Sequence, residues 1–144
     1  MIDRIDHVVM NCRDVEAMAS WYERVLGFRR ETFGPDRRLA LKFGRQKINL
    51  RPTGAANWQT GAADAPGSLD FCFITEEGLE RAAERLRGCG VEITLGPVPR
   101  TGALSAMTSI YCRDPDGNLV EIARYDAAAE RPVSTNRSPA SIPG

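Results

Sequence analysis

Residues 5–28, IDHVVMNCRDVEAMASWYERVLGF, are matched 63 residues later by residues 68–91, SLDFCFITEEGLERAAERLRGCGV. Each stretch begins with a short apolar-rich strand pattern, passes through acidic residues, and continues as a helical pattern that ends at Gly27 or Gly90. An internal repeat defines the structural unit from which a fold is built. We therefore expect two copies of one module, each opening with a strand and a helix.

The helix boundaries follow from periodicity and from the residues at each end. Apolar side chains recur at three- and four-residue steps from Val15 to Leu26, which predicts the first helix. Asp14 is a suitable N-cap, and Gly27 suits the left-handed position after the last turn. The second helix is expected over residues 78–89, with Gly90 closing it.

Three strand-like segments follow each helix. They span residues 28–33, 38–44 and 47–52 in the first half and residues 91–98, 105–113 and 118–125 in the second. The run Asp114-Pro115-Asp116-Gly117 predicts a hairpin turn, because proline presets φ and glycine accepts a positive φ. Each half is therefore β-α-β-β-β. The expected fold class is α+β: two βαβββ modules related by a pseudo-two-fold repeat, with the helices on one face.

A single domain, residues 1–125, is expected to contain both modules. Module one covers about residues 3–52 and module two about residues 67–125. Residues 52–67, rich in glycine and alanine, are predicted to form a mobile linker. Residues 126–144 are small, polar and proline-bearing, which is typical of a disordered tail.

Composition excludes several partners. Nineteen basic and nineteen acidic residues give a net charge of zero, which argues against nucleic acid as the main partner. No apolar run approaches the length of a membrane span, and the N-terminus has no secretory pattern. The four cysteines are far apart and form no CxxC pair, so we interpret them as small hydrophobes in a reducing compartment. These features predict a cytoplasmic protein without a membrane or nucleic-acid partner.

Strand parity places four polar side chains on the face away from the helices. Alternation along a strand sends neighbouring side chains to opposite faces, and the apolar residues of each strand are expected under the helices. The other face takes Arg51 and Cys72 among others, and the four polar side chains that interrupt the strands there are those of His7, Asn49, Asp70 and Glu121, hereafter the polar set. His7 and Asp70 are 63 residues apart, the same offset as the repeat. If the two sheets curl toward each other, the polar set would meet in one cleft.

The opening IDHVVMNCRDVEAMASWYERVLGF and the closing DPDGNLVEI resemble the vicinal-oxygen-chelate superfamily, which includes glyoxalase I, bleomycin-binding proteins and extradiol dioxygenases. The resemblance covers roughly residues 3–125. The segments GPVPRTGA and QKINL are similar to the group called glyoxalase domain-containing protein 5. In metal-dependent relatives, ligands come from the first and last strands of each module. The resemblance therefore implies His7, Asn49, Asp70 and Glu121 as metal ligands.

The ligand types restrict the chemistry that the resemblance implies. His7 is the only histidine of the chain, so a site with two histidines from one chain is impossible. One imidazole, two carboxylates and an amide oxygen favour manganese, magnesium or iron over zinc or nickel. The implied enzyme is a glyoxalase-like lyase or isomerase, or a dioxygenase, that chelates a small oxygenated substrate or its oxyanion intermediate. Glu121 is the implied catalytic residue, acting as ligand and proton carrier.

Candidate substrate-binding residues are Arg51, Arg100, Thr101 and Tyr111, and a solvated surface position is the alternative for each arginine. The alternative function is a non-catalytic module that sequesters a small molecule, as bleomycin-binding relatives do. The exposed edges of two open sheets predict a homodimer. The sequence leaves open whether the site lies within one chain or across two.

Overall fold

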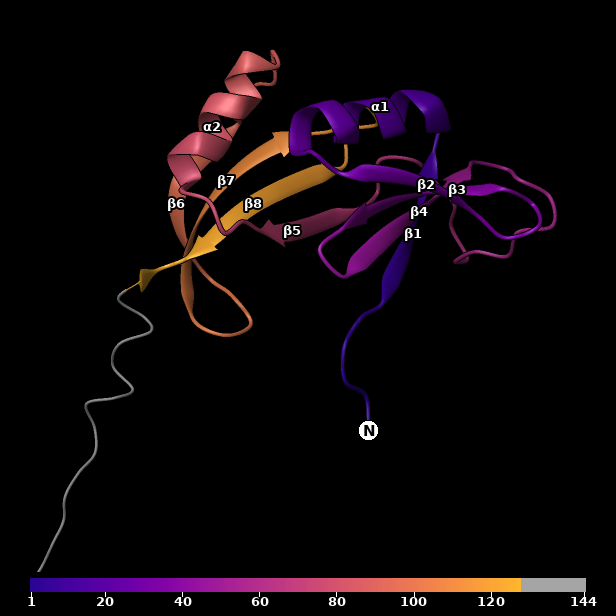
Figure 1. Ribbon diagram of the computed structural model, residues 1–144, viewed down its shortest axis with the longest axis horizontal. Helices are drawn as coiled ribbons and strands as arrows, with labels where there is room; N and C mark the ends of the chain where they lie inside the picture. The colour runs from indigo at the N-terminus through magenta and orange to yellow at the C-terminus, as the bar shows by residue number, and fades with distance from the viewer. Residues whose placement is uncertain (128–144) are drawn as a thin grey trace, which may run out of the picture.

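The computed structural model describes residues 1–127 and contains two four-stranded sheets with one helix each. The first module consists of β1 (His7–Cys12), α1 (Val15–Leu26), β2 (Arg29–Phe33), β3 (Arg38–Phe43) and β4 (Gln46–Pro52). The second consists of β5 (Asp70–Ile74), α2 (Leu79–Gly88), β6 (Leu95–Thr101), β7 (Ala106–Arg113) and β8 (Leu119–Tyr125). Figure 1 shows the two sheets beside each other, with both helices on the same side of them. The predicted α+β fold with two βαβββ modules is confirmed.

Both sheets have the same strand order. The first is β1-β4-β3-β2 and the second β5-β8-β7-β6. In each sheet the first and last strands of the module are parallel neighbours, and the remaining pairs are antiparallel. β1 and β5 are therefore each left at the edge of a sheet, beside the strand that ends their module.

The local signals of the first helix act as predicted. The carboxylate of Asp14 accepts a hydrogen bond from the backbone N–H of Ala17 at 3.0 Å, which satisfies one free donor of the first turn. Gly27 follows the last turn with a φ of 72°, and its N–H bonds back to the carbonyl of Glu23. The second helix is shorter than expected, and β6 begins at Leu95, four residues later than the strand predicted from Val91.

One hydrophobic core under the helices joins the two modules. It takes residues from both sheets, including Met10, Leu50, Ile110 and Val120, and from both helices. The Tyr22 hydroxyl of α1 donates a buried hydrogen bond of 2.8 Å to Asp114, in the turn between β7 and β8. Burial raises the pKa of Tyr22 far above its usual range, and Asp114 adds to that effect.

The linker between the modules is anchored to the first sheet, which corrects the prediction of a mobile segment. Arg51 of β4 donates to the carbonyls of Trp58 and Ala55 at 3.0 and 2.9 Å. Its guanidinium also contacts Asn11 at 2.8 Å and Asp64 at 3.4 Å. A buried cation with four acceptors ties the linker across the end of the sheet.

Asp126, the first residue of the predicted tail, is hydrogen-bonded to β7. The backbone N–H of Asp126 bonds to the carbonyl of Ala106, and its carboxylate accepts from Thr108 at 2.8 Å. The rest of the predicted tail, from residue 128 onward, lies outside the described residues. Neither helix among residues 1–127 has the length and apolar character that a bilayer span requires.

Candidate functional site

The polar set lies on the face of each sheet that turns away from the helices, as parity predicted. Met10 and Cys12 of β1 and Ile48 and Leu50 of β4 enter the core, so the positions between them face the other way. In the second sheet the core takes Phe71, Phe73, Val120 and Ile122. Asp70 and Glu121 are therefore on the opposite face, together with Cys72.

The polar set does not converge within one chain. His7 lines a hollow of about 800 Å³ between the β3–β4 hairpin and β5, whereas Asp70 and Glu121 line a separate hollow of about 370 Å³ on the second sheet. Nowhere in residues 1–127 do three or more His, Cys, Asp or Glu side chains come close enough to hold one ion. The four side chains are therefore not gathered within one chain, because the core holds the two modules together on their helix side, and a cleft shared by the polar set stays a prediction.

His7 is oriented by its neighbour in the chain. Its Nδ1 lies 2.9 Å from the carboxylate of Asp6, and its side chain is 45% exposed. A carboxylate can only accept, so Nδ1 carries a proton, and in the neutral imidazole the lone pair is on Nε2. The hydrogen bond from His7 lowers the pKa of Asp6. A histidine held this way by a carboxylate is arranged as metal-binding histidines usually are.

Asn49 has an unsatisfied buried oxygen. The residue is 6% exposed, and its Oδ1 has no hydrogen-bond partner among residues 1–127. A buried polar atom left without a partner costs about 1–3 kcal/mol. An amide oxygen in that state is available to a cation, and oxygen is the ligand that magnesium and manganese prefer. This atom is the observation by which the residues present fit a metal ion.

Glu121 is held by one hydrogen bond on one of its oxygens. Ser109, which is fully buried on β7, donates from Oγ to Oε2 of Glu121 at 2.6 Å. Cys72 stands opposite Glu121 in the parallel ladder between β5 and β8. Burial, followed by the charge of Glu121, raises the pKa of the Cys72 thiol to about 11. The second sheet therefore carries a fixed carboxylate beside a protonated thiol.

The four predicted substrate-binding residues have different surroundings. Arg100 and Tyr111 line the hollow that contains Asp70 and Glu121. Thr101 is exposed at the end of β6 and does not line that hollow. The guanidinium of Arg51 is hydrogen-bonded to the linker and to Asn11 of β1, and its role in substrate binding stays a prediction.

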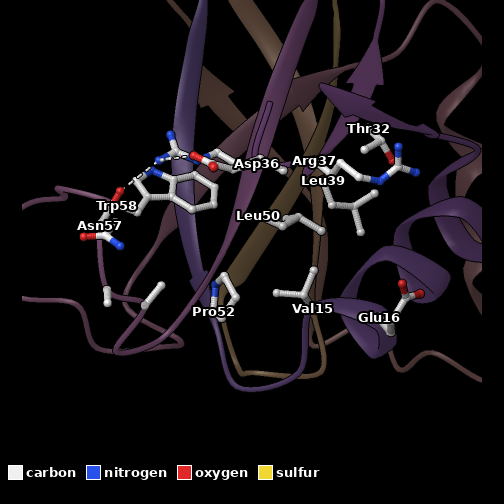
Figure 2. Close-up of a pocket in the computed structure, with 13 residues that line it drawn as sticks. Val15, Glu16, Thr32, Asp36, Arg37, Leu39, Leu50, Pro52, Asn57 and Trp58 are labelled. Carbon is white, nitrogen blue, oxygen red and sulfur yellow. Dashed lines mark hydrogen bonds and ion pairs between the residues drawn. The ribbon is translucent and has the colours of Figure 1, made fainter. Parts of the chain in front are cut away.

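Another hollow, of about 530 Å³, lies between the linker, the β2–β3 turn and the start of α1 (Figure 2). The guanidinium of Arg38 lies over the ring of Trp58 at 4.0 Å and donates to the carbonyl of Asn57. No member of the polar set lines it. Sequence reasoning did not find this hollow, and a tryptophan within a polar linker was the only signal of it.

The repeated βαβββ architecture is that of a glyoxalase-type protein. The chain belongs to the Glyoxalase/Bleomycin resistance protein/Dioxygenase superfamily, whose family model matches residues 4–122.

Two curated relatives share much of the sequence. Virulence protein STM3117 of Salmonella typhimurium is 45% identical over 125 residues, which is 87% of this chain and 86% of that protein. Glyoxalase domain-containing protein RDO1 of Mycosarcoma maydis is 40% identical over 86% of this chain and 69% of that protein. These similarities extend over both modules.

Solved structures agree with the fold. An integron cassette protein from the mobile metagenome of V. cholerae superposes with a TM-score of 0.85 at 44% identity, covering 88% of this chain and 98% of that one. A lactoylglutathione lyase from Agrobacterium tumefaciens superposes with a TM-score of 0.66 at 22% identity over 86% of this chain and 95% of that one. TnmS3, an antibiotic-binding protein from a Streptomyces species, has a TM-score of 0.69 at 21% identity over 87% and 98% of the two chains. At these lower identities the likeness concerns the fold alone.

Proposed function

We propose that the protein is a metal-dependent enzyme whose sites form between two copies of the chain. The observation that most directly supports this proposal is the buried Oδ1 of Asn49, which has no hydrogen-bond partner among residues 1–127 and lies on the same open face as His7. His7 and Asn49 supply a nitrogen and an oxygen from one copy. Asp70 and Glu121 supply two carboxylates from the other. This set suits manganese, magnesium or iron(II).

The free edges of the sheets support this assembly. β1 and β5 are both edge strands. β1 carries His7 and lies next to β4, which carries Asn49. β5 carries Asp70 and lies next to β8, which carries Glu121. If β1 of one copy approaches β5 of the second with the open faces continuous, all four side chains gather at the seam. Exposed sheet edges are normally covered, and pairing them would cover both.

Exposed apolar side chains mark the same seam. Val8 on β1 is 39% exposed and Ile74 on β5 is 45% exposed. Both line the hollow of about 800 Å³ that also contains His7, Phe43 and Phe73. Contiguous exposed apolar surface is typical of protein–protein contacts. A second copy is the partner that would bring the missing carboxylates to His7.

The bound ion would act as a Lewis acid that stabilises negative charge developing on a small oxygenated substrate. The residues of the chain do the remaining work. Glu121, with one oxygen fixed by Ser109, presents its other oxygen to the site and serves as the proton carrier. Asp6 keeps Nε2 of His7 free. The reaction class is that of a glyoxalase-like lyase or isomerase, or of a dioxygenase.

A second candidate is a small-molecule-binding protein without catalysis. The observation that favours it is the aromatic lining of the His7 hollow, which includes Phe28, Phe43, Phe71 and Phe73. Apolar hollows of this size accept drug-sized ligands. In this case the polar set would be solvated rather than ligated.

We also propose a cytoplasmic location, because the four cysteines are free thiols.

A divalent-metal titration separates the two candidates. The native protein is titrated with manganese, magnesium, iron(II) and zinc by calorimetry, alongside His7→Ala. If the protein is a metal-dependent enzyme, the native protein should bind one ion per chain. His7→Ala should then bind the ion at least tenfold more weakly, because losing a ligand weakens binding at least as much as losing the group that supports that ligand. Absence of saturable metal binding in the native protein would favour the binding module.

A further inference from the structure

The hollow around Glu121 contains two positive side chains whose role in metal binding is not evident. It is lined by Asp70, Arg100, Tyr111, Arg113 and Glu121, among others, and has a volume of about 370 Å³. A divalent ion bound to Asp70 and Glu121 would gain nothing from a nearby guanidinium, because like charges repel. The arginines therefore point to a ligand that is itself negative.

Arg100 and Tyr111 form a pair with two unused donors. Nε of Arg100 donates to the Tyr111 hydroxyl at 2.8 Å, and Nη1 donates to the carbonyl of Pro99 at 3.0 Å. The phenol oxygen thus accepts, and its own proton is left to donate. Nη2 of Arg100 donates no hydrogen bond to another group within residues 1–127. A phenol O–H and a guanidinium N–H side by side form a binding site for an oxyanion.

This pair is held next to Glu121 by the sheet. Tyr111 stands directly opposite Glu121 in the ladder between β7 and β8, and opposite Leu95 in the ladder between β6 and β7. Tyr111 is only 9% exposed, so its ring is fixed by packing. The guanidinium lies 5.4 Å from the centre of that ring, which restricts its position further.

We infer that Arg100 and Tyr111 bind the carboxylate of the substrate, and that the substrate class is small carboxylates with a second oxygen on the neighbouring carbon. The position of the second oxygen rests on the proposed function, because it would bind the ion at Glu121. The carboxylate subsite itself does not depend on a metal. Arg100 and Tyr111 then determine specificity for an anion over a neutral molecule of the same shape.

Glycolate and glycolamide test this inference, since they have the same size and hydroxyl group and differ in charge. Each is titrated into ¹⁵N-labelled protein, with and without magnesium, and the amide shifts of β6 and β7 are followed. With magnesium we expect glycolate to bind about tenfold more tightly than glycolamide, the effect of a charge-assisted hydrogen bond. Without magnesium the preference should be smaller but present, because Asp70 and Glu121 then repel the anion.

Variants of Arg100 and Tyr111, with a matched control, test whether these two residues cause the preference for glycolate over glycolamide. Arg100→Gln should abolish the preference for glycolate, and Tyr111→Phe should reduce it by about threefold while the ring still packs. Arg87→Gln makes the same charge change on the exposed side of α2 and should leave the preference unaltered. Far-ultraviolet circular dichroism and thermal unfolding check that each variant folds.

The outcomes are distinguishable from those of the metal titration. Equal binding of glycolate and glycolamide to the native protein would overturn the inference, as would an unchanged preference in Arg100→Gln. Shifts confined to the first sheet, around Lys42 and Lys47, would also overturn it. If metal uptake fails but the metal-free preference for glycolate depends on Arg100, the carboxylate subsite stands and the metal proposal falls.

Discussion

Asn49 and Glu121 occupy equivalent positions in the two sheets. Asn49 pairs with Val9 across β4 and β1, and Glu121 pairs with Cys72 across β8 and β5. Cys72 follows Val9 by 63 residues, the offset of the sequence repeat. The two positions differ in chemistry, because Asn49 has an unpartnered buried oxygen whereas Glu121 is held by Ser109. The repeat thus carries one neutral and one charged oxygen donor at corresponding places.

The linker should depend on Arg51 for its position. Arg51→Met removes the cation that binds two linker carbonyls, Asn11 and Asp64, and leaves those acceptors without their partner. We expect the free energy of unfolding to fall by about 2–4 kcal/mol, measured by urea denaturation. Arg45→Met, at an exposed turn, is the control and should change it by less than about 0.5 kcal/mol. Equal effects of the two variants would refute the anchoring role.

Gly67 should tolerate no side chain. Its φ is 79°, and a Cβ there would lie 2.3 Å from the backbone carbonyl oxygen of Asp116. Gly67→Ala is therefore expected to cost about 2–3 kcal/mol, because both the conformation and a backbone contact are strained. Gly61→Ala, with no atom within 4 Å of the added carbon, should be neutral or stabilising by up to about 1 kcal/mol. Thermal unfolding of both variants measures the change in stability. A loss of stability in Gly61→Ala as large as that in Gly67→Ala would contradict this account.

Cys72 should react slowly with iodoacetamide at neutral pH, because its thiol is partly buried although the residue as a whole is exposed. The thiolate is the reacting form, and a pKa of about 11 leaves roughly a hundredfold less thiolate at pH 8 than the ordinary value of 9.0 would. The rate should therefore keep rising up to about pH 11. Peptide mass spectrometry separates Cys72 from the other cysteines. A rate that levels off near pH 9 would show that the pKa of Cys72 is not raised.

The charge of Glu121 is the second cause of that raised pKa, after burial. Glu121→Gln removes the charge and leaves most of the burial, so alkylation of Cys72 at pH 8 should become several-fold faster. Glu76→Gln alters an exposed carboxylate elsewhere and serves as the control. An unaltered rate in Glu121→Gln would mean that the charge of Glu121 does not raise the pKa of Cys72.

The sequence predicted what depends on local periodicity. The limits of α1, the cap at Asp14 and the open-face position of the polar set all follow from side-chain spacing along one element. The separation of His7 from Glu121 could not be predicted this way, because it depends on how the two modules pack against each other. That packing rests on long-range contacts such as Tyr22 with Asp114, which no repeat or parity pattern reveals.

Arg51 illustrates the same limit within one strand. Parity correctly placed it on the open face beside Asn49, and from there a role in substrate binding was a reasonable expectation. Its actual partners come from the linker, a segment without periodicity whose path could not be predicted. Local spacing determines the direction of a side chain but not what lies opposite it.

Mixing two inactive variants tests most directly whether sites form between two copies. The native protein should have about twice the chain mass of 15.8 kDa in light scattering. His7→Ala and Glu121→Gln should each bind manganese at least tenfold more weakly, so that neither takes up much of it at a concentration that just fills the native sites. After both are mixed and allowed to exchange subunits, about half of the dimers are mixed, and one of the two sites in each has His7 and Glu121 intact. We predict that the mixture regains roughly a quarter of the native manganese capacity, whereas no recovery after demonstrated subunit exchange would contradict a site shared between copies.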